Sequence, residues 1–278
     1  MYKLDLHAHM PVFHHLIFTR VNRREYYLEL LEKLFRKKGT LVLGIANSGN
    51  NGKYRKFVGG LGKLPKEYKV GKEFEDYFVS VSKGKKKIYF VKTDEIATDK
   101  GHVLIVGYPH DIKSKKLADI FSKVKRRDCV VIANHPLHHL GIDYFFYSKL
   151  IGGNDKVSIS KRELNKYKGK FDAIELNSYF PEDWDKVRNY SRKNKIPVVA
   201  DSDAHEMDEL FRSWFEIKKL DFRNPDKFKK SLKRGLRKGL KVHARAHGFE
   251  AKYIHVLHGL INKYGGKLGL LSKFKYFT

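Results

Sequence analysis

The 278-residue sequence contains one cysteine, Cys129, and no long apolar run. A single cysteine cannot form an intramolecular disulfide and is compatible with a reducing compartment. No stretch approaches the roughly 18 apolar residues of a membrane-spanning helix, and the mean hydropathy is −0.53. Met1 to Asp5 lack the apolar segment of a secretory signal. We therefore expect a cytoplasmic protein with no membrane partner; its oligomeric state is left open.

Negative charge is also scarce. Lys and Arg number 58 and Asp and Glu 31, which gives a net charge of +27. Adaptation to heat would add charges of both signs, so it does not explain this excess. A polyanionic partner, such as nucleic acid, a nucleotide or an anionic membrane, does explain it. The alternative is a basic surface that only aids solubility. From Lys218 onwards there are 17 Lys/Arg and three Asp/Glu, so about half of the excess lies in this last part.

Apolar, strand-like segments alternate with helical ones along the chain, which predicts a mainly parallel α/β sheet, open or closed into a barrel. The expected strands are 3–9, 40–46, 102–107, 129–133, 173–176, 197–200 and 214–217, with a hairpin at 76–96. The expected helices are 25–38, 117–127, 182–195, 225–238 and 249–264. The Gly- and Lys-rich stretch 47–72 is predicted to be a long loop.

Histidine and carboxylate side chains gather where these strands end. They are His7, His9, Glu95, His135, Asp203 and His205. Active sites of parallel sheets lie at the carboxyl ends of the strands, so these side chains should meet. One His-x-His pair alone could be a solvated strand end, but the full set suffices for two metal ions that share a carboxylate. Imidazole and carboxylate ligands favour zinc, manganese or iron over calcium.

Four segments resemble, in order, motifs of the PHP (polymerase and histidinol phosphatase) superfamily. They are Asp5-Leu6-His7-Ala8-His9, Asp94-Glu95-Ile96 with Gly101-His102-Val103-Leu104, Ala133-Asn134-His135-Pro136, and Ser202-Asp203-Ala204-His205. The resemblance implies a distorted (β/α)7 TIM-like barrel that hydrolyses phosphoesters with two or three metal ions at its carboxyl rim. We expect this barrel at 1–217 and a basic helical extension, packed on it, at 218–278.

The resemblance also implies the ligands. His7, His9, Glu95 and Asp203 would hold one metal, Glu95, His102 and His135 a second, and His205 with His15 (or His14) a third. One motif departs from the family: where Thr-Asp-His is usual, the chain has Asn47 and Ser48 in place of the aspartate and histidine. Amide and hydroxyl groups are poorer ligands. We therefore expect two well-held divalent ions, Zn, Mn or Fe, and a weak or empty third site.

Two ions about 3.5–4 Å apart would lower the pKa of a bridging water, and the resulting metal-bound hydroxide would attack phosphorus. Asp203 and His205 are the expected catalytic residues for proton transfer. Asp5 either supports the metal ligands from behind or is an ordinary strand-end acceptor.

Arginine and lysine side chains near the rim are candidates for binding phosphate. They are Arg20, Arg212, Lys53 and Arg55, and each could instead be a surface ion-pair partner. The charge favours a nucleic acid or nucleotide as the phosphate-ester substrate. The alternatives are a phosphatase of small metabolites, similar to histidinol phosphatase, and a non-catalytic protein that binds nucleic acid.

Overall fold

The computed structural model describes residues 1–9, 23–47, 52–124, 128–138 and 157–248. The strands are β1 Tyr2–Ala8, β2 Thr40–Asn47, β3 Lys69–Gly71, β4 Phe78–Lys83, β5 Lys86–Thr98, β6 Gly101–Val106, β7 Val130–Ala133, β8 Ala173–Asn177, β9 Val198–Asp201, β10 Trp214–Ile217 and β11 Lys241–His243. The helices are α2 Arg23–Arg36, α3 Gly52–Leu61, α4 Leu117–Lys123, α6 Lys161–Lys166, α7 Trp184–Asn194 and α8 Pro225–Arg237. The helix expected at 249–264 lies outside the described residues.

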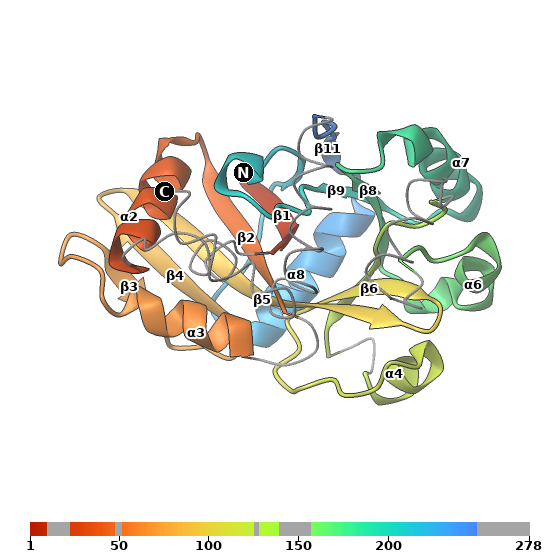
Figure 1. Cartoon of the computed structure of the whole chain (residues 1–278), viewed down its shortest axis with the longest axis horizontal. Helices are drawn as coiled ribbons and strands as arrows, with labels where there is room; N and C mark the ends of the chain where they lie inside the picture. Colours follow the sequence, from red (N-terminus) through yellow and green to blue (C-terminus); the bar gives the residue numbers. More distant parts are fainter. Residues whose placement is uncertain (10–22, 48–51, 125–127, 139–156, 249–278) are drawn as a thin grey trace, which may run out of the picture.

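These strands form one sheet that nearly closes into a barrel. The order is β11-β10-β1-β2-β5-β6-β7-β8-β9, and β3 and β4 extend it beside β5. The last strand returns to the first, because Ala8 bridges Ala204 and the Leu6 N–H donates to Asp201 Oδ1 at 2.6 Å. Helices α2 and α3 lie beside β2 to β4, and α6 and α7 lie toward the opposite end of the molecule (Figure 1). The expected α/β class and barrel-like sheet are therefore present.

A sevenfold repeat of strand and helix is not confirmed. Strand β6 runs antiparallel to both β5 and β7, and β10 runs antiparallel to β1. The connection from β5 to β6 is too short for a crossover helix, because only Asp99 and Lys100 separate the strands. Gly101 makes this reversal possible: its φ is 119°, and a Cβ there would lie 2.5 Å from the backbone of Ser158.

The expectation of a loop over 47–72 is wrong, since α3 occupies residues 52–61 and β3 follows it. The glycines of this stretch suggested a loop, but its apolar residues recur at helical spacing. The buried face of α3 consists of Tyr54, Phe57, Val58 and Leu61. Gly60 allows the helix to approach α2, because a Cβ there would lie 2.2 Å from the ring of Tyr27.

Helix α8 closes the end of the barrel at which the parallel strands begin. Its buried residues Phe228, Leu232 and Leu236 join a core cluster that includes Leu4 and Leu6 of β1. Asn224 caps the helix, since its side chain accepts from the Lys227 N–H at 2.8 Å. The helix expected at 225–238 is thus confirmed, and Figure 1 shows it crossing behind β1, β2 and β5.

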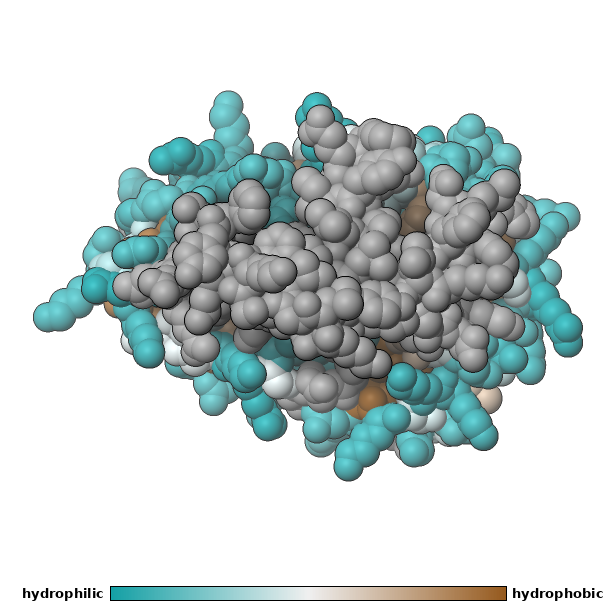
Figure 2. Space-filling view, in the orientation of Figure 1, coloured by the Kyte–Doolittle hydropathy of each residue, from teal (hydrophilic) through white to brown (hydrophobic). Residues whose placement is uncertain are grey.

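The described surface in Figure 2 is predominantly hydrophilic, as the large excess of Lys and Arg predicts. Among the described residues, no helix has the length and apolar character needed to cross a membrane. The division at residue 217 stays a prediction. Strand β11, which follows that boundary, pairs with β10 and so extends the same sheet.

Candidate metal centre

His7, near the end of β1, lies at the middle of a compact group of imidazoles and carboxylates. Its side chain is fully buried, and its Nε2 lies 3.1 Å from His9 Nε2 and 3.2 Å from Asp203 Oδ1. Glu95 of β5 approaches both histidines, at 3.5 Å from His7 Nε2 and 3.0 Å from His9 Nε2. The two nitrogens of the His-x-His pair and two carboxylates therefore converge on one point.

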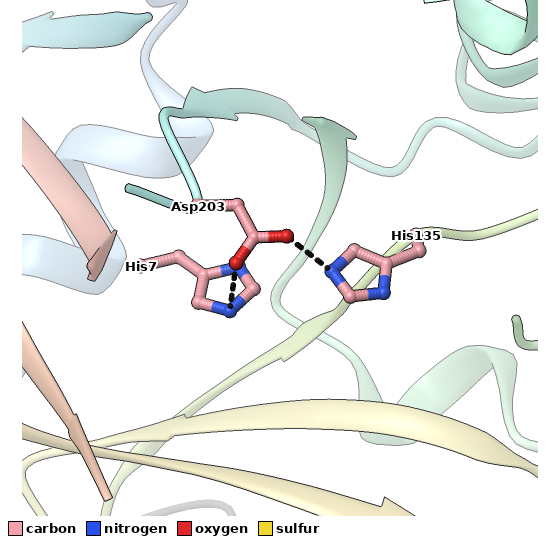
Figure 3. A group of neighbouring side chains, drawn as sticks. All are labelled: His7, His135 and Asp203. Atoms are coloured by element: carbon pink, nitrogen blue, oxygen red, sulfur yellow. Dashed lines mark ion pairs between the residues drawn. The ribbon is translucent and has the colours of Figure 1, made fainter. Parts of the chain in front are cut away.

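Asp203 bridges two parts of this group. In Figure 3 its carboxylate lies between His7 and His135; the Oδ2 atom is 3.2 Å from His135 Nε2. Four overlapping groups each bring their ligand atoms within 4.8 Å of one another. They are His7/His135/Asp203, His7/His9/Glu95, His9/Asp203/His205 and Glu95/His102/His135. Because Glu95 and Asp203 each belong to two groups, adjacent cations could share their carboxylates.

The backbone at this centre adopts unusual conformations. Asp203 has a φ of 53° and His135 a φ of 43°, both in the left-handed region that disfavours residues with a Cβ. Residues held in such conformations cluster at functional sites, where surrounding structure overcomes a cost of about 1–3 kcal/mol each. Both strained residues offer ligand atoms here, which supports a functional role for this edge of the sheet.

Opposite charges at the centre shift the pKa values of its members. Burial disfavours a charge on His7, but Asp203, Glu175 and Glu95 outweigh it and raise the pKa of His7 well above its ordinary value. Burial likewise disfavours the Asp203 carboxylate, but His7 and the other surrounding imidazoles hold the pKa of Asp203 well below its ordinary value. Positive charge therefore stabilises the buried carboxylates of this centre, and either protons or a metal cation can provide it.

The residues present fit a divalent cation. His102 Nε2 is buried and has no hydrogen-bond partner within the described part of the chain, although its Nδ1 lies 2.8 Å from Glu95 Oε1. A buried imidazole nitrogen without a partner is costly unless something binds it. The mixture of imidazole nitrogens and carboxylate oxygens suits zinc, manganese or iron.

Glu175 of β8 belongs to this centre and was not predicted. Its carboxylate is fully buried and accepts from His7 Nδ1 at 2.7 Å and from the His135 N–H at 3.0 Å. A proton on Nδ1 leaves the Nε2 of His7 free to face Glu95 and Asp203. The sequence did contain one indication of this role. Glu175 lies within the apolar strand Ala173–Asn177, and a carboxylate buried there needs hydrogen-bond partners.

Asp5 holds the loop that carries Asp203 and His205. Its Oδ1 accepts from the Ser202 N–H at 3.0 Å, and its Oδ2 accepts from the Ser202 hydroxyl at 2.6 Å and the Phe211 N–H at 2.8 Å. These bonds join β1 to residues some 200 positions away. Asp5 thus lies behind the ligand atoms and restrains the backbone of the last motif.

Asn47, at the altered second motif, is engaged in the fold. Its Oδ1 accepts from the Tyr54 N–H at 2.8 Å, and its Nδ2 donates to the Thr93 carbonyl at 3.0 Å. The side chain therefore connects β2 to α3 and β5. Ser48 and His15, the other residues considered for a third site, lie outside the described residues. His205 does lie at the centre, stacked on His9 with ring centroids 4.5 Å apart.

The four residues predicted to bind phosphate have different surroundings. Lys53 on α3 is half-buried; burial lowers its pKa, and the charge of Glu95 partly offsets this effect. Arg55 is exposed on the same helix. Arg212 donates its Nε–H to the Ala246 carbonyl at 2.6 Å, so part of its guanidinium holds the chain. Arg20 lies outside the described residues.

Comparison with known proteins agrees with the motifs. Residues 181–236, which include Asp203 and His205, match the family model described as PHP-associated (PHP_C). The search of curated proteins gave no match. The crystal structure of PsfC from Pseudomonas syringae PB-5123 has a similar fold, with a TM-score of 0.54 and 12% identity over 96% of this chain and 98% of that one. The match at 181–236 supports membership in the PHP-domain superfamily.

Proposed function

We propose that the protein is a metal-dependent phosphoesterase that acts on a nucleic acid or a nucleotide. The observation that carries the proposal is the convergence of imidazoles and carboxylates in overlapping groups with ligand atoms within 4.8 Å. PHP family members are metal-dependent phosphoesterases, and the match over residues 181–236 is compatible with a hydrolase. In this proposal the sheet is a variant of the family's distorted (β/α)7 barrel, and the enzyme acts in the cytoplasm.

Different residues of the chain bind the metal ions, support the metal ligands and bind phosphate. His7, His9, Glu95 and Asp203 would hold one divalent ion, Glu95, His102 and His135 a second, and His205 would contribute to a third. When bound, the ions act as Lewis acids and lower the pKa of a coordinated water. Glu175 and Asp5 keep the ligands in place from behind. Lys53, half-buried and in electrostatic contact with Glu95, supplies positive charge for a phosphate.

His205 is the best candidate to move a proton. Its Nε2 lies 3.6 Å from Asp203 Oδ1, and its side chain keeps 17% of its surface exposed, whereas His7 has none. An imidazole open to solvent can exchange protons with a leaving group and with water. Asp203 lies between this histidine and the buried ligands, with its Oδ1 atom 3.6 Å from His205 Nε2 and 3.2 Å from His7 Nε2.

One specific observation favours a non-catalytic protein that binds nucleic acid. Both polar atoms of the Asn47 side chain are hydrogen-bonded within the fold, so the altered second motif contributes no metal ligand from that position. A phosphatase of small metabolites is the other alternative. The two enzymes differ in the substrates that they hydrolyse, whereas the non-catalytic protein hydrolyses none.

The test is metal analysis of the purified protein together with hydrolysis of p-nitrophenyl phosphate, nucleotides, histidinol phosphate and a labelled oligonucleotide in Mn, Zn or Fe. We expect bound metal and turnover that Asp203→Asn and His7→Ala abolish. His110→Ala is the matched control, because His110 is an exposed histidine in a loop. Cleavage of small monoesters only would favour the metabolite phosphatase. Oligonucleotide binding without turnover in any of these metals would overturn the enzymatic proposal.

A further inference from the structure

A groove of about 1530 Å³ lies beside α8, at the end of the barrel where the parallel strands begin. Its walls are the exposed face of α8, the connection from β10 to α8 and the start of β11. Its floor includes Tyr2 at the start of β1 and Tyr89 near the start of β5. We call it the α8 groove. It is not the metal centre, which lies at the opposite end of these strands.

The α8 groove is strongly basic. Eight of its lining residues are Lys or Arg, and all eight are exposed: Lys218, Lys219, Arg223, Lys227, Lys230, Arg234, Lys238 and Lys241. The lining contains two acidic residues, Glu216 and Asp221. Asp221 is already bound to Arg223, whose Nε and NH2 groups donate to it. The groove therefore presents a large surplus of positive charge to solvent.

Four of these cations form a line along α8. Lys227, Lys230, Arg234 and Lys238 are separated by three, four and four residues, which places them on one face of a helix. At 1.5 Å of rise per residue the line is about 16 Å long, with a charge about every 5–6 Å. The opposite face of α8 is buried in the barrel core. Packing thus fixes the direction in which the cations project.

Aromatic rings lie in the floor of the same groove. Tyr2, Tyr89 and Phe222 are half-buried, and the rings of Tyr89 and Phe222 are stacked with centroids 3.6 Å apart. Tyr2 lies against Phe222 at 5.9 Å. Rings that are held rigidly and remain partly exposed can stack with nucleobases, which contributes about 1–3 kcal/mol per base.

We propose that the α8 groove is a binding site for single-stranded nucleic acid, separate from the metal centre. A line of cations for the phosphates beside partly exposed rings for the bases is the arrangement that single strands require. A flat anionic membrane would reach the lysines but not the rings in the floor. The distance from Tyr89 to Glu95 along β5 is about 20 Å, at about 3.3 Å per residue. Binding at the groove therefore does not require the phosphoesterase activity.

The test measures binding of a fluorescein-labelled oligo(dT) or oligo(U) of about 15 nucleotides, near the upper range for such sites. Fluorescence anisotropy is recorded with the full-length protein in excess chelator, so that no cleavage occurs. We expect affinity to fall steeply between about 50 and 200 mM salt.

The decisive variant is the triple substitution Lys227→Gln, Lys230→Gln and Arg234→Gln. Each lost phosphate contact should lower the slope of log affinity against log salt by about 0.7, so three contacts lower it by about 2. The matched control is Lys63→Gln, Lys66→Gln and Lys69→Gln, which removes the same charge from exposed residues that do not line the groove. We expect the control to keep the slope of the unaltered protein.

Equal slopes for the two triple variants would overturn the proposal, since binding would then depend on net charge alone. Binding to phosphatidylserine vesicles without binding to the oligonucleotide would also overturn it and identify a membrane surface instead. Circular dichroism and thermal unfolding of both variants exclude loss of the fold as the cause. The substituted positions are exposed, so both variants should unfold at the temperature of the unaltered protein.

Discussion

Glu175→Gln should weaken metal binding while leaving the fold intact. Glu175 Oε1 accepts from His7 Nδ1 at 2.7 Å, and Oε2 accepts from the His135 N–H at 3.0 Å and from Asn177 Nδ2 at 3.2 Å. An amide has only one oxygen, so in either orientation its NH2 group faces one of these donors. The substitution therefore leaves a buried donor unsatisfied and loosens the orientation of His7.

The size of the effect follows from these bonds. A buried donor without a partner costs about 1–3 kcal/mol, and loss of a partner behind a metal ligand reduces metal affinity about 10–100-fold. A 10–100-fold change corresponds to about 1.4–2.7 kcal/mol. The estimate from the unsatisfied donor and the estimate from the lost metal affinity agree. We therefore expect Glu175→Gln to raise the metal dissociation constant by about one to two orders of magnitude.

The assay is competition with a chromophoric chelator, or calorimetric titration, using Zn or Mn. Thermal unfolding of the metal-free protein reports separately on the fold. Glu73→Gln provides the matched control, because it makes the same chemical change at an exposed carboxylate. A folded Glu175→Gln protein with unaltered metal affinity would refute the role assigned to this glutamate.

Four further predictions can be tested. Asn47→Ala removes the bonds to Tyr54 and Thr93 and should lower the free energy of unfolding by about 1–2 kcal/mol, measured in urea; an unchanged value would contradict the structural role. Gly44→Ala should destabilise the fold by about 3 kcal/mol or more in the same assay, since its Cβ would lie 2.1 Å from the Leu6 carbonyl oxygen. Burial raises the pKa of Cys129 to about 12, so its thiol should react with a disulfide reagent at pH 8 only after unfolding; rapid reaction of the native protein would disprove this. Although burial opposes it, nearby carboxylates raise the pKa values of His7, His9 and His135, so protons compete more strongly with a metal for these imidazoles. Metal binding should release these protons and weaken as the pH falls, which calorimetry in buffers of different ionisation enthalpy would detect.

The sequence predicted much of the centre because strand ends are easy to recognise. His7 and His9 lie at the end of one apolar strand, and Asp203 follows another, so a parallel sheet brings them to one edge. Glu175 was missed because it lies inside a strand and forms no motif with its neighbours. Its role depends on His7 and His135, which are distant in sequence, and local patterns carry no information about such partners.

The fold was predicted less completely, for two physical reasons. Alternation of apolar segments indicates strands but does not give their direction, and the reversal of β6 follows from the short connection at Asp99 and Lys100. In α3, glycine content suggested a loop, whereas burial of Tyr54 and packing of Phe57 against Tyr27 of α2 and Phe90 of β5 stabilise a helix. In the case of α3, tertiary packing outweighed the local signal.

Residues far along the chain hold β1 in place, and this arrangement affects when the metal centre can form during synthesis. His7 and His9 are synthesised long before the residues that hold β1, which are Asp201 and strand β10. The loop between Asp201 and β10 is held in turn by His247, which bonds the Ser202 carbonyl at 2.7 Å. A nascent chain that ends before this histidine therefore has ligands without a complete frame. The native arrangement of the ligands therefore forms only after residues up to His247 have been synthesised.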